Sequence, residues 1–189
     1  GRIYRYDLSQ KAWLPVVYLS ETQVPTAFLP TKEGVFIACG ASLVKRTLDL
    51  QTETPVTMSG STIKCLFSYG SLIYFLDGDT VRTYDRTSLA AGPTFATPYA
   101  WLNYGGLSRS ARPVFAQTTG TGYTTSPGVT PDDIIQFPVS TDGRILTCSD
   151  SPYHGNFSIG SRQYLTPDEQ LLIDNSGVNC QSWVNHYER

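Results

Sequence analysis

The sequence predicts an all-β fold of antiparallel sheets, and three observations support this class. Short runs rich in Val, Ile, Tyr, Phe and Thr alternate with polar turns along the chain. The composition includes 16 Gly and one Met, and few segments have the apolar spacing of an amphipathic helix. A glycine that follows a polar turn recurs at Gly34, Gly70, Gly106 and Gly143, in steps of about 36 residues. One small sheet cannot bury its apolar face alone, so such units pack against one another.

The expected strands follow the runs of β-forming residues. In the first half they are Ile3–Leu8, Pro15–Leu19, Thr26–Leu29, Val35–Cys39, Leu43–Leu50, Ile63–Phe67, Leu72–Leu76 and Val81–Tyr84. The pattern resumes at Ile134–Val139, Arg144–Thr147, Arg162–Leu165 and Leu171–Ile173. Short turns such as Asp77–Asp79 fit hairpins, so the first half is expected to be an antiparallel meander.

The repeat is clearest in residues 33–49 and 69–85, each of which has an apolar strand, a glycine turn, a strand with an arginine and a closing aspartate. The opening segment Gly1–Leu8 looks like the second half of this unit, so we expect the chain to begin within one. The copy around Gly106 carries an insertion, and Asp142–Cys148 keeps only a turn and a first strand. These units predict a β-propeller-like array. A β-sandwich or galectin-like receptor-binding domain is the alternative.

We expect one all-β domain over residues 1–189, as a whole protein or as a fragment of a larger one. Residues 117–133 are rich in Thr, Gly and Pro and are predicted to form a long exposed loop that either contacts a partner or is a disordered insertion with no role. No apolar run reaches the roughly 18 residues of a transmembrane segment. The net charge is −2 and the arginines are scattered, so nucleic-acid binding is not expected. A surface built from Thr, Ser, Tyr, Asn and Gln favours an extracellular location or a virion or cell surface.

The four cysteines, Cys39, Cys65, Cys148 and Cys180, contain no C-x-x-C pair. If the protein is secreted, we expect the disulfides Cys39–Cys65 and Cys148–Cys180, because each closes a loop of about one repeat. Buried thiols that act as small apolar core residues are the alternative.

The sequence offers little for catalysis or metal binding. There are two histidines, His154 and His186, and no G-x-S-x-G motif. The aspartate pairs at Asp77 and Asp79 and at Asp132 and Asp133 are interpreted as solvated turn carboxylates, since neither continues into a calcium-binding loop. We therefore expect no catalytic residue, no metal and no cofactor.

Aromatic residues are the best candidates for a binding site. Tyr99, Trp101, Asn103 and Tyr104 place large rings beside an amide and a Gly-Gly turn, and Tyr123 lies in the expected loop. Such residues stack on sugars or anchor protein interfaces. The alternative is that these rings fill the core between sheets.

Residues 68–85, Ser-Tyr-Gly-Ser-Leu-Ile-Tyr-Phe-Leu-Asp-Gly-Asp-Thr-Val-Arg-Thr-Tyr-Asp, resemble a blade of hemopexin-like and kelch-like propellers. This resemblance implies a disc of four to seven blades that binds proteins, glycans or matrix. Tyr104–Leu107 and Gly143–Thr147 are also similar to short pieces of paramyxovirus attachment heads.

These observations predict a non-catalytic binding module of an extracellular or viral surface protein. Its partner is expected to be a protein or glycan receptor, engaged through loops and exposed aromatic residues. A glycan-acting hydrolase on a propeller scaffold and an intracellular protein-interaction scaffold are the alternatives.

Overall fold

The computed structural model describes residues 1–20, 23–96, 113–125, 134–150 and 163–174. The chain divides into two compact units, Gly1–Ile63 and Lys64–Arg189. The described strands form antiparallel sheets, and no helix occurs among the described residues, which confirms the predicted all-β class. That the chain forms one domain stays a prediction.

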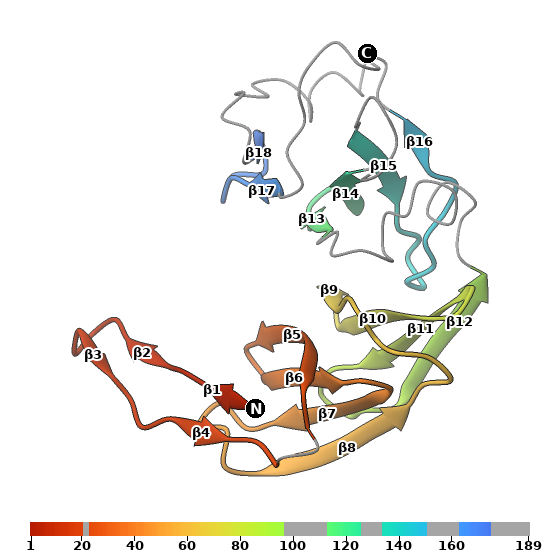
Figure 1. Ribbon diagram of the computed structural model, residues 1–189. Helices are drawn as coiled ribbons and strands as arrows, with labels where there is room; N and C mark the ends of the chain where they lie inside the picture. Colours follow the sequence, from red (N-terminus) through yellow and green to blue (C-terminus); the bar gives the residue numbers. More distant parts are fainter. Residues whose placement is uncertain (21–22, 97–112, 126–133, 151–162, 175–189) are drawn as a thin grey trace. The chain divides into compact units, whose positions relative to one another are not determined.

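The first unit contains a four-stranded sheet and a long hairpin (Figure 1). The sheet is an antiparallel meander in chain order, made of β5 (Pro25–Thr31), β6 (Gly34–Cys39), β7 (Ser42–Arg46) and β8 (Glu53–Met58). The hairpin pairs β1 (Arg2–Ile3) with β4 (Val17–Tyr18) and β2 (Tyr6–Asp7) with β3 (Ala12–Trp13). A four-stranded antiparallel meander is the unit from which propeller blades are built.

The core of the first unit lies around β6, whose residues from Gly34 to Ala38 are all buried. Ile37 is fully buried and packs in one apolar cluster with Val35, Val44 and Leu50. Ile3 and Val17 of the hairpin belong to the same cluster, so the hairpin is anchored to the sheet by apolar side chains.

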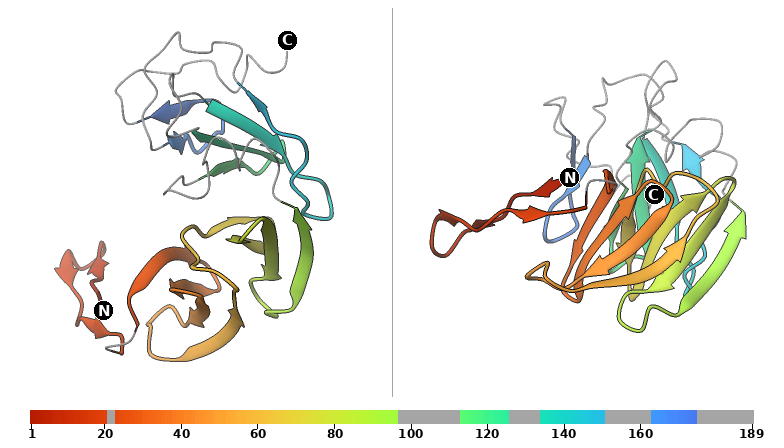
Figure 2. Two further views of the ribbon diagram at one scale, coloured as in Figure 1. Left: turned by 45° about the vertical axis from the view of Figure 1, so that its right-hand side comes forward. Right: turned by 60° about the horizontal axis from the view of Figure 1, so that its bottom comes forward.

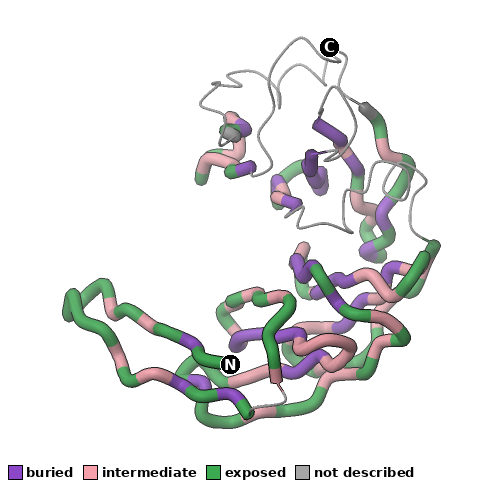
Figure 3. Tube along the Cα trace, in the orientation of Figure 1, coloured by how far each residue is buried: buried purple, intermediate pink, exposed green. Residues whose placement is uncertain are grey.

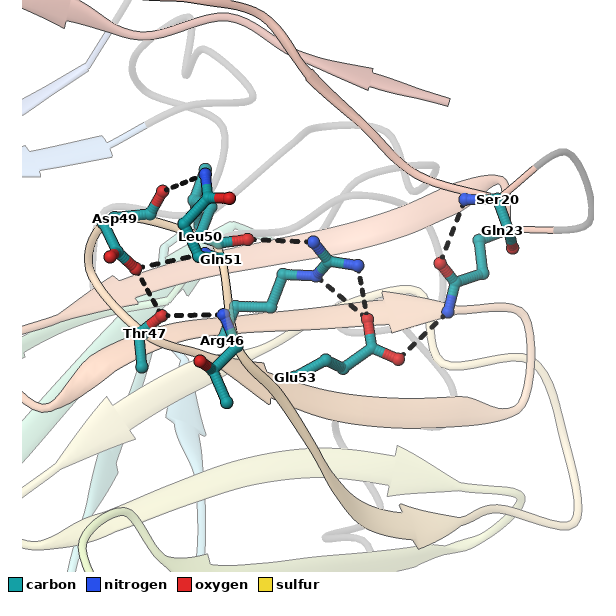
Figure 4. Close-up of polar contacts among 9 residues, drawn as sticks. Ser20, Gln23, Arg46, Thr47, Asp49, Leu50, Gln51 and Glu53 are labelled. Atoms are coloured by element: carbon teal, nitrogen blue, oxygen red, sulfur yellow. Dashed lines mark hydrogen bonds and ion pairs between the residues drawn. The ribbon is translucent and has the colours of Figure 1, made fainter.

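The side chain of Arg46 cross-links the β7–β8 end of this sheet by hydrogen bonds (Figure 4). The Nε and Nη2 atoms of Arg46 donate to Oε2 of Glu53 at 2.9 and 2.7 Å, and Nη1 donates to the carbonyl oxygen of Leu50 at 3.0 Å. The other carboxylate oxygen of Glu53 accepts from Nε2 of Gln23 at 3.3 Å. This two-nitrogen contact fixes the β7–β8 connection and links it to the segment that precedes β5.

The second unit contains two further four-stranded meanders and a short hairpin (Figures 1 and 2). One meander is β9 (Phe67–Tyr69), β10 (Leu72–Asp77), β11 (Thr80–Asp85) and β12 (Ala91–Ala96). The other is β13 (Val114–Ala116), β14 (Thr121–Thr125), β15 (Ile134–Pro138) and β16 (Ser149–Asp150). The hairpin pairs β17 (Gln163–Leu165) with β18 (Leu172–Asp174).

Aromatic rings join the two meanders of this unit. The ring of Phe67 stacks on Tyr74 at 5.0 Å between centroids and on Phe115 at 5.3 Å. Phe115 in turn meets the ring of Phe137 edge-on at 5.4 Å. Tyr74 and Phe137 are fully buried, so these rings form the core between the two sheets.

The glycine repeat is observed at two of its four predicted positions. Gly34 begins β6, and Gly70 lies in the turn before β10 with φ of 56°. In the third sheet the equivalent turn carries Gly120, with φ of 68°, whereas Gly143 lies between β15 and β16 and Gly106 is outside the described residues. The third sheet therefore begins later than a 36-residue step predicts.

The long exposed loop expected over 117–133 is wrong in its first part, because residues 121–125 form the buried strand β14. Threonine and tyrosine have high strand propensity, but the glycines among them made the segment look like a loop. Gly122 is also required for packing, since a Cβ atom there would lie 2.0 Å from the Phe137 ring. Residues 126–133 are outside the described part of the chain.

Candidate functional site

The structure describes one of the five predicted site residues. Tyr99, Trp101, Asn103 and Tyr104 lie outside the described residues. Tyr123 is only 2% exposed and packs with Ala116, Ile134 and Leu172. Its prediction as a ligand-binding residue on an exposed loop is therefore corrected, because β14 points its ring into the core.

The expected Cys39–Cys65 disulfide is absent, since no disulfide occurs among the described Cys39, Cys65 and Cys148. Cys39 packs against the core of the first unit, whereas Cys65 belongs to a core cluster of the second. Burial raises the pKa of the Cys39 thiol. Cys180, the expected partner of Cys148, lies outside the described residues, so that pairing stays a prediction.

Among the described residues, several exposed aromatic side chains lie on the N-terminal hairpin rather than at the predicted site. Tyr6 is 45% exposed, Tyr4 61%, Tyr18 68% and Trp13 70%. We call these four side chains the aromatic face. Figure 3 shows that the hairpin is exposed along most of its length. Single exposed aromatics are common on protein surfaces, but four on one short hairpin form a patch that needs an explanation.

Strand alternation explains the exposure of Tyr4 and Tyr6. In register, Ile3 lies opposite Val17, and both are buried at 9% and 8% exposure. Residues 2, 4 and 6 are exposed, whereas residues 3, 5 and 7 are less so. Because successive side chains of a strand point to opposite sides, Ile3 and Val17 anchor one side of the hairpin in the core. Tyr4 and Tyr6 then project from the other side, while Trp13 and Tyr18 lie exposed on the paired segment, opposite Tyr6 and Arg2.

The rings of the aromatic face are held in defined contacts. Tyr6 lies opposite Trp13, and their rings meet edge-on with centroids 5.2 Å apart and an interplanar angle of 72°. The guanidinium carbon of Arg2 lies 5.6 Å from the centre of the Tyr18 ring. A hydrogen bond with the Tyr4 side chain raises the pKa of Arg2. Edge-on aromatic pairs and cation–π contacts both restrict the side chains before any ligand binds.

The turn at the tip of the hairpin is also ordered. Oδ1 of Asp7 accepts hydrogen bonds from the backbone N–H groups of Ser9 at 2.8 Å and Gln10 at 3.0 Å, and from the Ser9 hydroxyl at 2.6 Å. These donors lower the pKa of Asp7, the Ser9 hydroxyl most strongly. In Figure 2 the β2–β3 end of the hairpin extends beyond the sheet β5–β8 of the same unit. The aromatic face is therefore carried by a structured element.

In the described part of the chain, no group of three or more His, Cys, Asp or Glu side chains is placed to hold a metal ion. The described ranges also contain no helix long and apolar enough to cross a membrane.

One sequence pattern could have identified part of the aromatic face. Tyr4 and Tyr6 alternate with Ile3 and Arg5, and this period of two places both tyrosines on one side of a strand. Residues 99–104 contain more aromatic residues than this shorter pattern.

Comparisons with known proteins assign no family. No family model matches the chain, and no curated protein matches it. The chain is similar to a solved structure described as "Crystal Structure of Mitotic Checkpoint Complex", with a TM-score of 0.48 and 9% sequence identity. The match covers 94% of this chain and 68% of that chain. At this TM-score and identity the likeness assigns neither a family nor a function.

Proposed function

We propose that this protein is a non-catalytic binding module whose aromatic face binds a protein partner. The observation that carries the proposal is the set of four exposed aromatic side chains on one short hairpin that is anchored in the core. Tyrosine, tryptophan and arginine dominate the binding energy of protein interfaces, and Arg2 lies among these rings. Because Ile3 and Val17 already anchor the hairpin in the core, the exposed rings are not needed to anchor it.

The proposal includes the location expected from the composition, the exterior of a cell or the surface of a virion. A glycan receptor is the other partner class that aromatic rings bind, by stacking on sugar rings. We favour a protein because the face combines four aromatic side chains with a guanidinium.

A comparison of matched variants tests this function. The full chain is labelled and applied to a library of cell-surface protein ectodomains and to an array of glycans, in parallel with Trp13→Ala. Leu48→Ala is the control, because Leu48 is 62% exposed but lies in the β7–β8 connection.

We expect at least one ectodomain to bind the unchanged chain and Leu48→Ala equally. Trp13→Ala should bind it about 30-fold more weakly, a loss of about 2 kcal/mol. Binding to glycans alone would overturn the choice of a protein partner. Equal binding by all three proteins would overturn the aromatic face as the site.

A further inference from the structure

The N-terminal hairpin carries a local excess of positive charge. Residues 2–18 contain Arg2, Arg5 and Lys11 against one acidic residue, Asp7, although the chain as a whole has 14 Lys and Arg and 16 Asp and Glu. None of these three cations forms an ion pair with a carboxylate in the described structure. The acidic residue does not offset them, because its Oδ1 atom is engaged by the donors of its own turn.

Arginines in the four-stranded sheets are compensated within their own sheet. Arg46 of β7 contacts Glu53 of β8 at 2.7 Å, and Arg82 of β11 contacts Asp77 of β10 at 2.9 Å. In each case a neighbouring strand supplies the carboxylate. The second strand segment of the hairpin, residues 12–18, contains no Asp or Glu. The hairpin therefore leaves its own positive charge uncompensated.

Arg2 lies within the aromatic face. It is exposed and lies opposite Tyr18, with its guanidinium carbon 5.6 Å from the centre of the Tyr18 ring. A hydrogen bond with the Tyr4 side chain raises its pKa, so the charged group is held by two tyrosines. Because a guanidinium has five N–H donors in a planar fork, donors remain for both oxygens of an incoming carboxylate. Arg5, by contrast, alternates with Tyr4 and lies on the side of Ile3.

A second cation lies at the far end of the hairpin. Lys11 is exposed in the turn between β2 and β3. The stretch from Arg2 to Asp7, where the turn begins, spans about 17 Å at about 3.3 Å per residue. The cross-strand pair of Tyr6 and Trp13 lies between the two charges along the hairpin. Positive charge therefore flanks the aromatic rings at both ends.

The balance of rings and cations indicates the class of partner. A polyanion such as a nucleic acid or a sulfated glycan is bound through many cations that contact successive anionic groups. The aromatic face has four exposed rings with two exposed cations at its ends, and rings with few charges are typical of protein interfaces. At such an interface, complementary charge comes from carboxylates of the partner.

We infer that the aromatic face binds an acidic segment of its protein partner. Two carboxylates of this segment pair with Arg2 and Lys11, and an apolar or aromatic residue between them packs against Tyr6 and Trp13. The inference rests on the proposed function and adds the charge and the spacing of the partner segment to it.

A peptide library provides the probe. Random peptides of about 12 residues, which are long enough to span the face when extended, are displayed on phage and selected on the immobilised full chain. We expect the recovered peptides to contain two Asp or Glu residues about four to six positions apart, with a Trp, Tyr, Phe or Leu between them. One recovered peptide is then synthesised, and its affinity for the full chain and for variants is measured.

Charge reversal at the two ends of the face tests the pairing. Arg2→Glu combined with Lys11→Glu should weaken binding of the peptide about tenfold or more, because two attractions become repulsions. Lys32→Glu combined with Lys64→Glu is the matched control, since both side chains are exposed outside the hairpin and the net charge changes equally. The control should change the affinity less than about twofold. A peptide with its two acidic residues replaced by lysine should prefer the chain with the reversed hairpin charges.

The outcomes separate the inference from the function on which it rests. Equal affinities of the two double variants, or recovered peptides without acidic residues, would overturn the inference and leave the aromatic face as a protein-binding site. Peptides that bind Trp13→Ala as tightly as the unchanged chain would overturn the proposed function. Heparin is tested in parallel, and binding of heparin without recovery of any peptide would assign the face to a polyanion. Recovery of no peptide and no binding of heparin would also overturn the inference.

Discussion

The hydroxyl of Tyr74 donates a hydrogen bond to the carbonyl oxygen of Gly143 at 3.0 Å, across 69 positions of the sequence. Tyr74 lies on β10 and Gly143 in the connection between β15 and β16, so the bond joins two sheets of the second unit. Gly143 has φ of 88°, and a Cβ atom there would lie 2.4 Å from Leu72 Cδ1. Glycine is required at this contact because it permits both the backbone conformation and the close approach.

Removal of this hydroxyl tests the contact. Tyr74→Phe leaves the ring in the core but leaves the Gly143 carbonyl without its donor, which should cost about 1–3 kcal/mol of unfolding free energy. Urea unfolding measures the loss. The control is Tyr164→Phe, because Tyr164 is 54% exposed and its change should cost less than about 0.5 kcal/mol. Equal stabilities of the two variants would contradict the structural role of the bond.

Alkaline pH should destabilise the second unit through the same residue. Burial raises the pKa of Tyr74 above the ordinary tyrosine value of about 10, with smaller contributions from Tyr69 and Asp142. The unfolded chain then releases this proton at lower pH than the folded one. The stabilisation is complete below pH about 10 and is lost as the pH rises from there towards the folded pKa. Tyr74→Phe should show a shallower loss of thermal stability above pH about 10, and an unchanged slope would refute this explanation.

Acid is expected to destabilise the protein by protonating aspartates in its turns, such as Asp85. The backbone N–H of Ser88, followed by that of Thr87 and the Ser88 hydroxyl, lowers the pKa of Asp85 to about 2. The contribution of a lowered pKa is present above the unfolded value of about 3.9 and is lost as the pH falls through the folded value. We expect the melting temperature to fall between pH about 4 and about 2, and Asp85→Asn to reduce that slope. Identical slopes in the two proteins would show that this turn does not control acid stability.

Glu169 is expected to stabilise the β13–β14 turn, although the two are far apart in the sequence. Its carboxylate accepts from the N–H groups of Gln117 at 2.7 Å and Thr118 at 3.0 Å, and from the Thr118 hydroxyl. In Glu169→Ala both N–H groups lose a charged acceptor, so their hydrogen exchange should accelerate about tenfold or more. The N–H of Val139, which donates to the Gly120 carbonyl at 2.7 Å, is the internal reference. Unchanged exchange at Gln117 and Thr118 would rule out the contact in solution.

The sequence predicted the interior strands of the first two four-stranded sheets, whereas β14, an interior strand of the third, was expected to be a loop. β6, β10 and β11 each contain an expected run and extend it by one or two residues, because buried strands require continuous apolar and aromatic residues. β8 and β12 were missed, since each contains a proline and has exposed positions. An outer strand needs only one buried side, and its pairing depends on a neighbour that local sequence does not reveal.

The candidate binding site was harder to predict than the fold. Aromatic residues occupy both cores and surfaces, so composition alone did not distinguish Tyr123, which is buried, from Tyr4, which is exposed. The distinction depends on which side of a strand faces the core. For the hairpin, Ile3 and Val17 determine that side, because they pack against Ile37 and Val44 from the sheet.

Substitution of one buried and one exposed residue of the hairpin tests the central claim most directly. Unfolding free energy and affinity for an ectodomain identified as a partner are measured for Val17→Ala and Trp13→Ala in the full chain. Val17→Ala should cost about 1.5–3 kcal/mol of stability and leave the affinity of the folded protein unchanged, because Val17 is buried in the core. Trp13→Ala should reduce affinity by about 30-fold and change stability by less than about 0.5 kcal/mol. A stability loss in Trp13→Ala as large as that in Val17→Ala, with normal affinity, would contradict the account.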